Sequence, residues 1–341
     1  MTRDDVWPPR APWVGRWLLV ICVLVLAMIM VGGATRLTDS GLSITEWNLE
    51  KGLTPPLTEA RWAEEFALYQ RTTEYQEQNY GMSLDDFRTI YWWEWGHRFL
   101  GKMLGVAFAL PFFFFLFTGR LRGRFRLTML LFALGGLQGF IGWWMVTSGL
   151  FQSLDVSPVR LAIHLAMAFL ILAIALWVAL GAFAWPSQTS RLGMPRWTPL
   201  VFMTLLFAQI LLGALLAGSR GGAAYADWPT IGGEWIPSSA FGLEPWLQNL
   251  ISDHATQHLL HRTTGYLAAL LALLMAGVAL LRGQGAARAA AGAVGALALV
   301  QAGLGIVTVI AGSPLWLGLT HQFVAALLWM AALACLRAGW R

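Results

Sequence analysis

The sequence predicts an all-α integral membrane protein whose eight transmembrane helices form two pseudo-symmetric four-helix bundles. Hydrophobic residues make up 57% of the 341-residue chain and charged residues only 12%, with a mean hydropathy of +0.59. The hydrophobic residues gather in eight long segments, and the second half of the chain repeats motifs of the first half in the same order. Such a composition is typical of membrane proteins and argues against a soluble domain.

Each apolar segment is long enough to cross a hydrocarbon core of ~30 Å as a helix that rises ~1.5 Å per residue. The predicted spans are residues 17–36, 92–117, 127–148, 160–184, 197–217, 256–281, 286–311 and 317–337. The first span is expected to be retained, because no small-residue cleavage site ends it and seven further spans follow.

Arginines predict the orientation of the helices. They gather at both termini and after the second, fourth and sixth spans, where Asp4 and Asp5 are the only acids, whereas residues 37–91 hold ten acids against four basic residues. Basic loops mark the cytoplasmic side, so both termini are expected in the cytoplasm and the long loops outside. Acids so close to the first span are unlike a mitochondrial presequence and favour a bacterial cytoplasmic (inner) membrane. The pI near 9.6 reflects this bias, so the expected partner is the lipid bilayer, with no nucleic acid.

Four pairs of motifs define the internal repeat. They are GLSITEW (41–47) with GAAYADW (222–228), EWGHRFLG (94–101) with HLLHRTTG (258–265), QGFIG (138–142) with QAGLG (301–305), and RLAIHLAMAFL (160–170) with LGLTHQFVAAL (317–327). Because the order is the same and each half has four spans, the halves are expected to be parallel repeats related by an axis along the membrane normal.

The boundary between the halves is expected in the proline-containing segment 185–199, which gives domains at residues 1–190 and 191–341. The first domain also carries a long outer loop. Apolar residues recur at helical spacing over residues 57–69 and predict a short helix at the membrane surface. The sequence SLDD at 83–86 fits a capping box, so a helix is expected to begin there and to continue into the second span.

Four of the six histidines lie about one turn inside the outer end of an even-numbered span: His97, His164, His261 and His321. Two imidazoles that face each other across a bundle can bind the two faces of a haem iron, so the sequence predicts one haem site in each bundle, near the outer face. A single histidine would equally suit interhelical hydrogen bonding or a proton relay, but four at matched depths favour haem. Zinc is disfavoured, because no cysteine or carboxylate cluster completes a tetrahedral site.

His254 is expected to be interfacial and solvated, and His258 to line the second site.

The two sites differ at Glu94, which aligns with His258. One interpretation is a structural ion pair with Arg98 or Lys102. The other, which the asymmetry favours, is a catalytic carboxylate that acts as an acid or base or stabilises a developing positive charge. Arg98 and Arg262 directly follow two ligand histidines, and each could reach lipid headgroups or pair with haem propionates. One haem would then carry electrons and the other would be acted upon.

Taken together, these motifs resemble the haem A synthase family over nearly the whole chain. The resemblance rests on GLSITEW followed by GLTPP, on EWGHRFLGK, on the Q-x-x-x-G motifs and on the order of the four histidines. Cys22 and Cys335, the only cysteines, lie inside spans, so the chain is similar to the cysteine-free branch of many Gram-negative bacteria and mitochondria. No external disulfide and no C-x-x-C-H haem attachment is expected.

The resemblance implies a fold of two four-helix bundles and a division of tasks between them. Residues 1–190 would hold the substrate, haem O, between His97 and His164, and Glu94 would act with them in catalysis. Residues 191–341 would hold haem b as cofactor between His261 and His321. A ring methyl of haem O would be oxidised to the formyl group of haem A for cytochrome oxidase assembly. Implied partners are a haem O synthase that supplies the substrate and an electron partner that no motif identifies.

Two other classes of function remain open. A two-haem b-type membrane electron carrier would share the histidine pattern, although all four ligands lie near one surface, whereas a transmembrane electron path usually places its haems in both leaflets. A transporter would account for the repeats, but the sequence lacks paired broken helices at mid-membrane.

Overall fold

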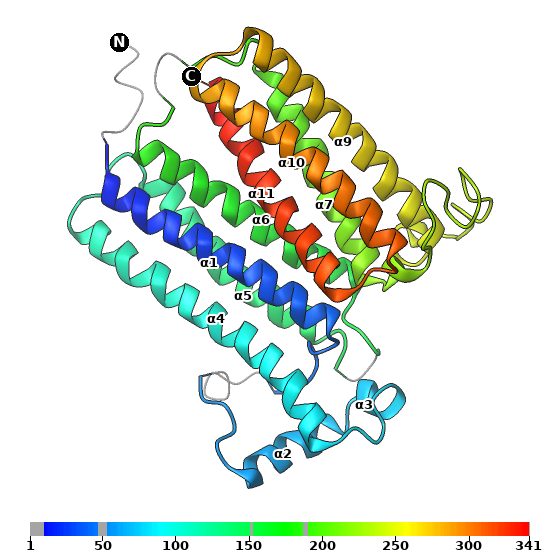
Figure 1. The fold of residues 1–341 in the computed structure, drawn as a ribbon. Coiled ribbons are helices and arrows are strands. Elements are labelled where there is room, and N and C mark those ends of the chain that lie inside the picture. The colour runs from blue at the N-terminus through cyan, green and yellow to red at the C-terminus, as the bar shows by residue number, and fades with distance from the viewer. Residues whose placement is uncertain (1–9, 47–52, 151–152, 187–189, 341) are drawn as a thin grey trace.

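The computed structural model describes residues 10–46, 53–150, 153–186 and 190–340. These residues form no strand, and eight of their helices are long and apolar enough to cross a membrane (Figure 1). The eight helices are α1 (Pro12–Leu37), α4 (Leu84–Phe117), α5 (Phe125–Val146), α6 (Pro158–Ala182), α7 (Trp197–Gly218), α9 (His254–Arg282), α10 (Gly285–Ile310) and α11 (Leu315–Trp340). Each predicted span falls on one of them, so the predicted fold class is confirmed. Trp47, Asp4 and Asp5 lie outside the described residues.

The helices form two groups along the chain. Helices α1, α4, α5 and α6 pack on one another, as do α7, α9, α10 and α11, and the groups meet where α6 contacts α7 and where α11 contacts α1 and α6. The indole nitrogen of Trp329 on α11 donates to the carbonyl oxygen of Phe169 on α6 at 3.0 Å, and the two rings meet edge to face. The domain boundary at residues 190 and 191 stays a prediction.

The two ends of the molecule differ. The start of α1 and the end of α11 lie at one end, and α2 (Glu59–Tyr69) and α3 (Thr73–Glu77) project from the opposite end, which we call the loop end (Figure 1). The loop end also carries the segment 219–253, with the 3₁₀ turn η2 (Gly221–Ala223) and the short helix α8 (Gln248–Ile251). Which end faces the cytoplasm stays a prediction.

Helix α4 begins at the predicted cap, about two turns before the predicted span. The hydroxyl of Ser83 accepts a hydrogen bond from the backbone N–H of Asp86 at 3.2 Å, which satisfies one of the free donors of the first turn. The first turns of α4 therefore extend beyond the bundle at the loop end, where they offer an aromatic surface to the preceding loop.

The short helix predicted within residues 57–69 is confirmed as α2, its apolar side chains pack on α4, and its position at the membrane surface stays a prediction. Trp62 and Tyr69 are buried against Phe87 and Tyr91 of α4, with ring centroids 5.0 Å apart for Trp62 and Tyr91 and 5.2 Å apart for Tyr69 and Phe87. Because α4 extends far enough to cover these aromatic rings, the apolar face of α2 is not available to lipid.

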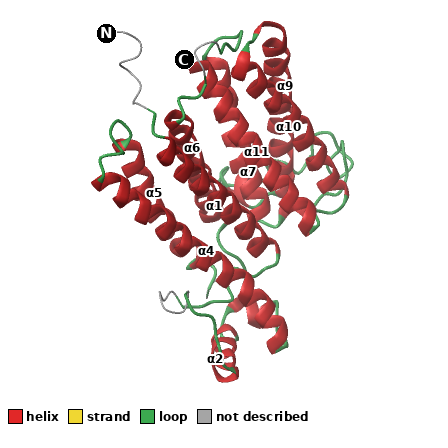
Figure 2. Cartoon of the chain, turned by 60° about the vertical axis from the view of Figure 1, so that its left-hand side comes forward, coloured by secondary structure: helices red, strands yellow, loops and turns green. Residues whose placement is uncertain are grey.

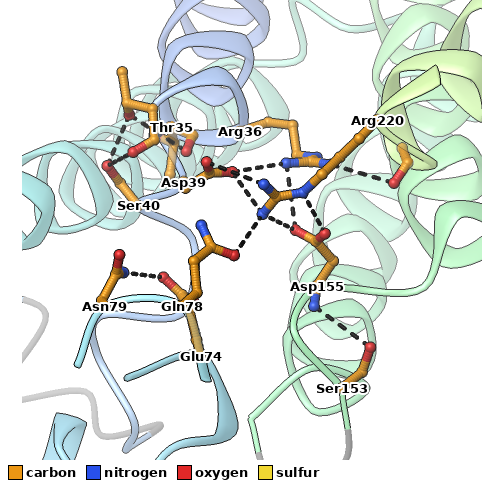
Figure 3. Close-up of polar contacts among 12 residues, drawn as sticks. Thr35, Arg36, Asp39, Ser40, Glu74, Gln78, Asn79, Ser153, Asp155 and Arg220 are labelled. Atoms are coloured by element: carbon orange, nitrogen blue, oxygen red, sulfur yellow. Dashed lines mark hydrogen bonds and ion pairs between the residues drawn. The ribbon is translucent and has the colours of Figure 1, made fainter. Parts of the chain in front are cut away.

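An ion-pair network joins the two groups of helices at the loop end (Figure 3). Arg36, at the end of α1, lies 3.2 Å from Asp39 and 3.4 Å from Asp155. Arg220, just after α7, lies 2.6 Å from Asp155 and 3.0 Å from Asp39, and it donates to the side-chain oxygen of Gln78 at 3.2 Å. The hydrogen bond to Asp155 and the nearby acids raise the pKa of Arg220. The network thus fixes the loops of the first group against the start of the second.

Candidate functional site

The structure brings the four predicted ligand histidines together in two pairs, one in each group of helices. His97 on α4 and His164 on α6 lie close enough for their charges to interact, and so do His261 on α9 and His321 on α11. Each pair therefore joins two different helices, as a macrocycle held between two imidazoles requires.

Each of these imidazoles packs against a glycine on a neighbouring helix. A Cβ atom added at Gly32, Gly142, Gly213 or Gly305 would lie 2.8, 3.0, 2.9 or 3.1 Å from the Cε1 atom of His97, His164, His261 or His321, respectively. Any larger residue would push the ring aside, so glycine fixes where each imidazole lies. The sequence motifs contained Gly142 and Gly305 but not the other two. The pattern MIMVG at 28–32 and QILLG at 209–213, at the same spacing, could have identified them.

Three of the four histidines also contact a glutamine amide four residues before that glycine. The Nε2 atom of Gln138 donates to the backbone oxygen of His164 at 3.1 Å and lies 3.4 Å from its ring Nε2. Gln209 donates to the backbone oxygen of His261 at 2.9 Å, with its amide 3.4 Å from the ring. For Gln301 the distance to the ring nitrogen of His321 is 3.0 Å.

Met28 takes the place of the fourth glutamine, because it lies four residues before Gly32. A Cβ atom at Gly101 would lie 3.6 Å from its terminal methyl, and a Cβ at the matching Gly265 would lie 3.0 Å from the amide nitrogen of Gln209. Among the described residues no side-chain amide is hydrogen-bonded to His97, whereas each of the other three histidines has a glutamine amide beside it.

The ring nitrogens show that these sites can accept a further partner. The Nδ1 atoms of all four histidines are buried with no hydrogen-bond partner among the described residues, and so are the side-chain oxygens of the three glutamines: Gln138, Gln209 and Gln301. Buried polar atoms without partners are costly and need a reason. A pair of imidazoles on two helices inside an apolar bundle would be able to hold a haem iron, so these residues fit a haem in each half.

Glu94 is the predicted site residue with the most complete set of partners. Its side chain is 4% exposed. One carboxylate oxygen accepts from the hydroxyl of Ser43 and from the backbone N–H of Ile44, both at 2.8 Å, and the other lies 2.5 Å from Arg98. The ion pair with Arg98, one of the two sequence interpretations, is thus present. It does not exclude the second, and a catalytic role for Glu94 stays a prediction.

Arg98 and Arg262 hold equivalent loops, a role that neither sequence interpretation included. Arg98 donates to the backbone oxygens of Ile44 at 2.8 Å and Glu46 at 3.1 Å. Arg262 donates to the backbone oxygens of Asp227 at 3.0 Å and Thr230 at 2.8 Å. Glu46 and Asp227 occupy the same position in the repeat. Each arginine, which directly follows a histidine in the sequence, is thus hydrogen-bonded to the matching loop of its own half. A contact with haem propionates stays a prediction.

His258 takes the place of Glu94 beside the second arginine. His258 as a whole residue is 1% exposed. Because a carbonyl can only accept, Nε2 donates to the backbone oxygen of Gly221 at 2.9 Å, and Nδ1 then accepts from Arg262 at 3.2 Å. Both ring nitrogens are used, so His258 anchors a loop and is not a further metal ligand. His254, expected to be interfacial and solvated, is half-buried, and its ring donates to the backbone oxygen of Ser219 at 3.1 Å.

The loop above the second histidine pair is also held by Asp227. Hydrogen bonds from the backbone N–H groups of Gly233 and Gly232, both at 2.9 Å, and from the hydroxyl of Thr230 at 2.8 Å hold the pKa of Asp227 well below its usual range. The carboxylate therefore remains ionised and shapes the turn whose carbonyl groups bind Arg262.

Comparison with known proteins finds relatives that match nearly the whole chain. Residues 15–333 match the model of a family described as cytochrome oxidase assembly protein. The chain is 45% identical to a haem A synthase of Maricaulis maris over 94% of both chains. It is 46% identical to one of Methylobacterium radiotolerans, over 93% of this chain and 87% of the relative, and 44% identical to one of Brucella suis, over 95% and 90%.

Proposed function

Because the chain belongs to the family of cytochrome oxidase assembly proteins that includes the haem A synthases, we propose that its two histidine pairs divide one reaction between a substrate haem and a cofactor haem. As a member of this family the protein is a membrane oxidoreductase that converts haem O to haem A for cytochrome oxidase assembly. One observation supports this division of tasks. In both halves each histidine packs on a glycine, but the first half has Glu94 and Met28 where the second half has His258 and Gln209.

The first pair, His97 and His164, binds the substrate. This assignment is supported by the presence of Glu94 beside this pair alone, since an enzyme needs a reacting group only at the haem that it changes. A carboxylate one helical turn before His97 lies within roughly 5 Å of the ligand along the helix, near the rim of a haem bound there. A ring methyl of haem O is the group to be oxidised.

Glu94 acts on that methyl group as a proton acceptor or as a fixed negative charge. The hydroxyl of Ser43 and the N–H of Ile44 hold one of its oxygens in place, and Arg98 holds the other. Such an arrangement orients the carboxylate before the substrate arrives, which is the condition for strong electrostatic or acid–base catalysis. The loop that Arg98 fastens keeps water away from the same region.

The second pair, His261 and His321, holds haem b as cofactor. Haem b bound there supplies one-electron transfer. The chain contributes two imidazoles, each braced by a glutamine amide, and the loop held by Arg262 and His258. We infer further that both termini are cytoplasmic in a bacterial inner membrane and that the loop end faces outward, because arginines flank the opposite end.

The test is to express the protein with a source of haem O and to analyse the extracted pigments. Haem A in the extract, dependent on His97 and His164, is the expected result. An extract that contains haem b alone, with haem O supplied, would instead identify a two-haem electron carrier.

A further inference from the structure

Helices α4 and α5 pack on each other less extensively than α9 and α10, their counterparts in the repeat. Three matched positions account for the difference. Phe108 and Phe112 follow His97 at the same spacing at which Ala272 and Ala276 follow His261. On the partner helices, Phe132 precedes Gln138 at the same spacing at which Gly295 precedes Gln301. The first bundle thus has three phenylalanines where the second has two alanines and a glycine.

The three phenylalanines form a layer between α4 and α5. The rings of Phe112 and Phe132 stack with centroids 5.3 Å apart, and the centroids of Phe108 and Phe132 are 6.3 Å apart. Aromatic rings of this size keep two helix backbones well separated. We call these three residues the phenylalanine layer.

In the second bundle the small residues allow direct contact. Ala272 is fully buried, and a Cβ atom at Gly295 would lie 2.6 Å from the Cβ of Ala276. Only glycine fits at position 295, because α9 and α10 approach each other closely there. The second bundle therefore has no opening between these two helices at this level.

Between the phenylalanine layer and the level of the histidines, α4 and α5 carry glycines where the second bundle has alanines: Gly105, Gly135 and Gly139 match Ala269, Ala298 and Ala302. Because α4 and α5 also pack less extensively, we interpret this glycine-lined stretch as an opening between them. Cβ atoms added at Gly105 on α4, or at Gly135 and Gly139 on α5, would have no other atom within 4 Å. Gly135 is exposed, whereas the matching Ala298 of the second bundle is 4% exposed. Figure 2 shows that α5 lies on the side of the molecule remote from α9, so the opening is not covered by the other half.

We propose that this opening between α4 and α5 is a lateral entrance, through which haem O passes from the bilayer to His97 and His164 and haem A returns. The proposal rests on the proposed function of the first site. Haem O carries a long apolar prenyl chain and therefore partitions into the bilayer. A route from the aqueous side would cross the loop that Arg98 fastens and the network of Arg36 and Arg220. A permanent cofactor needs no such route, which agrees with the closed second bundle.

The matched pair Gly135→Phe and Gly136→Phe tests the entrance. Both glycines have no atom within 4 Å of an added Cβ, but Gly136 matches Leu299, which is 56% exposed on the outside of α10. Protein in lipid vesicles is mixed with vesicles that carry haem O, and uptake is followed by the absorbance change that depends on His97. We expect uptake to slow roughly tenfold in Gly135→Phe, because the ring fills space that the macrocycle must cross, and to be unchanged in Gly136→Phe.

Equal uptake by both variants and the native protein would overturn the entrance. A native protein that takes up no haem O in a His97-dependent way would overturn the proposed first site itself, so the two failures are distinguishable. Haem b content at the second site reports on folding in every case.

A second variant closes the gap by copying the second bundle. The triple change Phe108→Ala, Phe112→Ala and Phe132→Gly should let α4 approach α5 and slow uptake, with haem b content retained. Phe117→Ala, at an 83% exposed position at the end of α4, is the control and should leave uptake unchanged. Faster or equal uptake by the triple variant would contradict a spacer role for the phenylalanine layer.

Discussion

Replacing Glu94 with glutamine removes one charge from the first site and almost none of its shape. The carboxylate is buried and accepts from Ser43, Ile44 and Arg98. A glutamine keeps one acceptor oxygen, so the main loss is the charge-assisted contact with Arg98, which still donates to two backbone oxygens. We expect the free energy of unfolding to fall by about 1.5–3 kcal/mol, the usual worth of one hydrogen bond to a charged group.

The effect on the reaction should be much larger than the effect on folding. If Glu94 accepts a proton or stabilises positive charge in the transition state, its loss lowers the rate by roughly 10²–10⁴-fold. The assay is the ratio of haem A to haem O in pigments extracted from the variant, with the b-type spectrum of the second site as a measure of intact protein. We expect haem O to accumulate and the b-type spectrum to persist.

Ser43→Ala is the control for this experiment. It removes one donor to the same carboxylate but leaves its charge and its ion pair, so it should destabilise the loop and still form haem A. An unchanged yield of haem A in Glu94→Gln would refute a catalytic role for the charge. Equal losses of haem A in both variants would show that Glu94 acts only by holding the loop.

Three further predictions concern the surroundings of the two sites. Met28→Gln should slow the release of haem from the first site to a haem-binding acceptor protein by roughly tenfold, because the new amide can hold the His97 ring in one orientation by a hydrogen bond; unchanged release would contradict this. Burial raises the pKa of Glu74 to about 8, so its protonated form favours the folded state. The stability of the α2–α3 region should therefore be greatest near pH 4.5 and fall as the pH rises towards 8, as hydrogen exchange can measure, and Glu74→Gln should abolish this dependence. Arg220→Ala should lower the free energy of unfolding by about 1 kcal/mol at low salt and by less at high salt, since its ion pairs are partly exposed; a loss that does not depend on salt would rule out the ionic contribution.

The sequence was sufficient to predict the eight helices and the histidine pairs, because both depend on local patterns. A run of apolar residues marks a helix that crosses the membrane whatever it packs against. The His-Arg motifs of the repeat placed His97 and His261 at equivalent positions, and the structure brings each close to its expected partner. The helix cap at Ser83 was likewise a local signal.

The parts that sequence did not predict depend on contacts between distant segments. Nothing local to Glu94 indicates that Ser43, fifty-one positions earlier, donates to it. The stripe of α2 carried no information on whether lipid or α4 would cover it. The role of the phenylalanine layer appears only when α4 and α5 are compared with α9 and α10. A large side chain on one helix has an effect only if a neighbouring helix is close enough to be held away by it.

The most direct test of the division of tasks is to analyse the haems of two purified variants, His97→Ala and His261→Ala, expressed with a source of haem O. The account predicts that His97→Ala retains haem b with its bis-histidine spectrum and contains no haem A, and that His261→Ala loses that haem b spectrum. Loss of the haem b spectrum in His97→Ala together with its retention in His261→Ala would contradict the assignment of substrate to the first half and cofactor to the second.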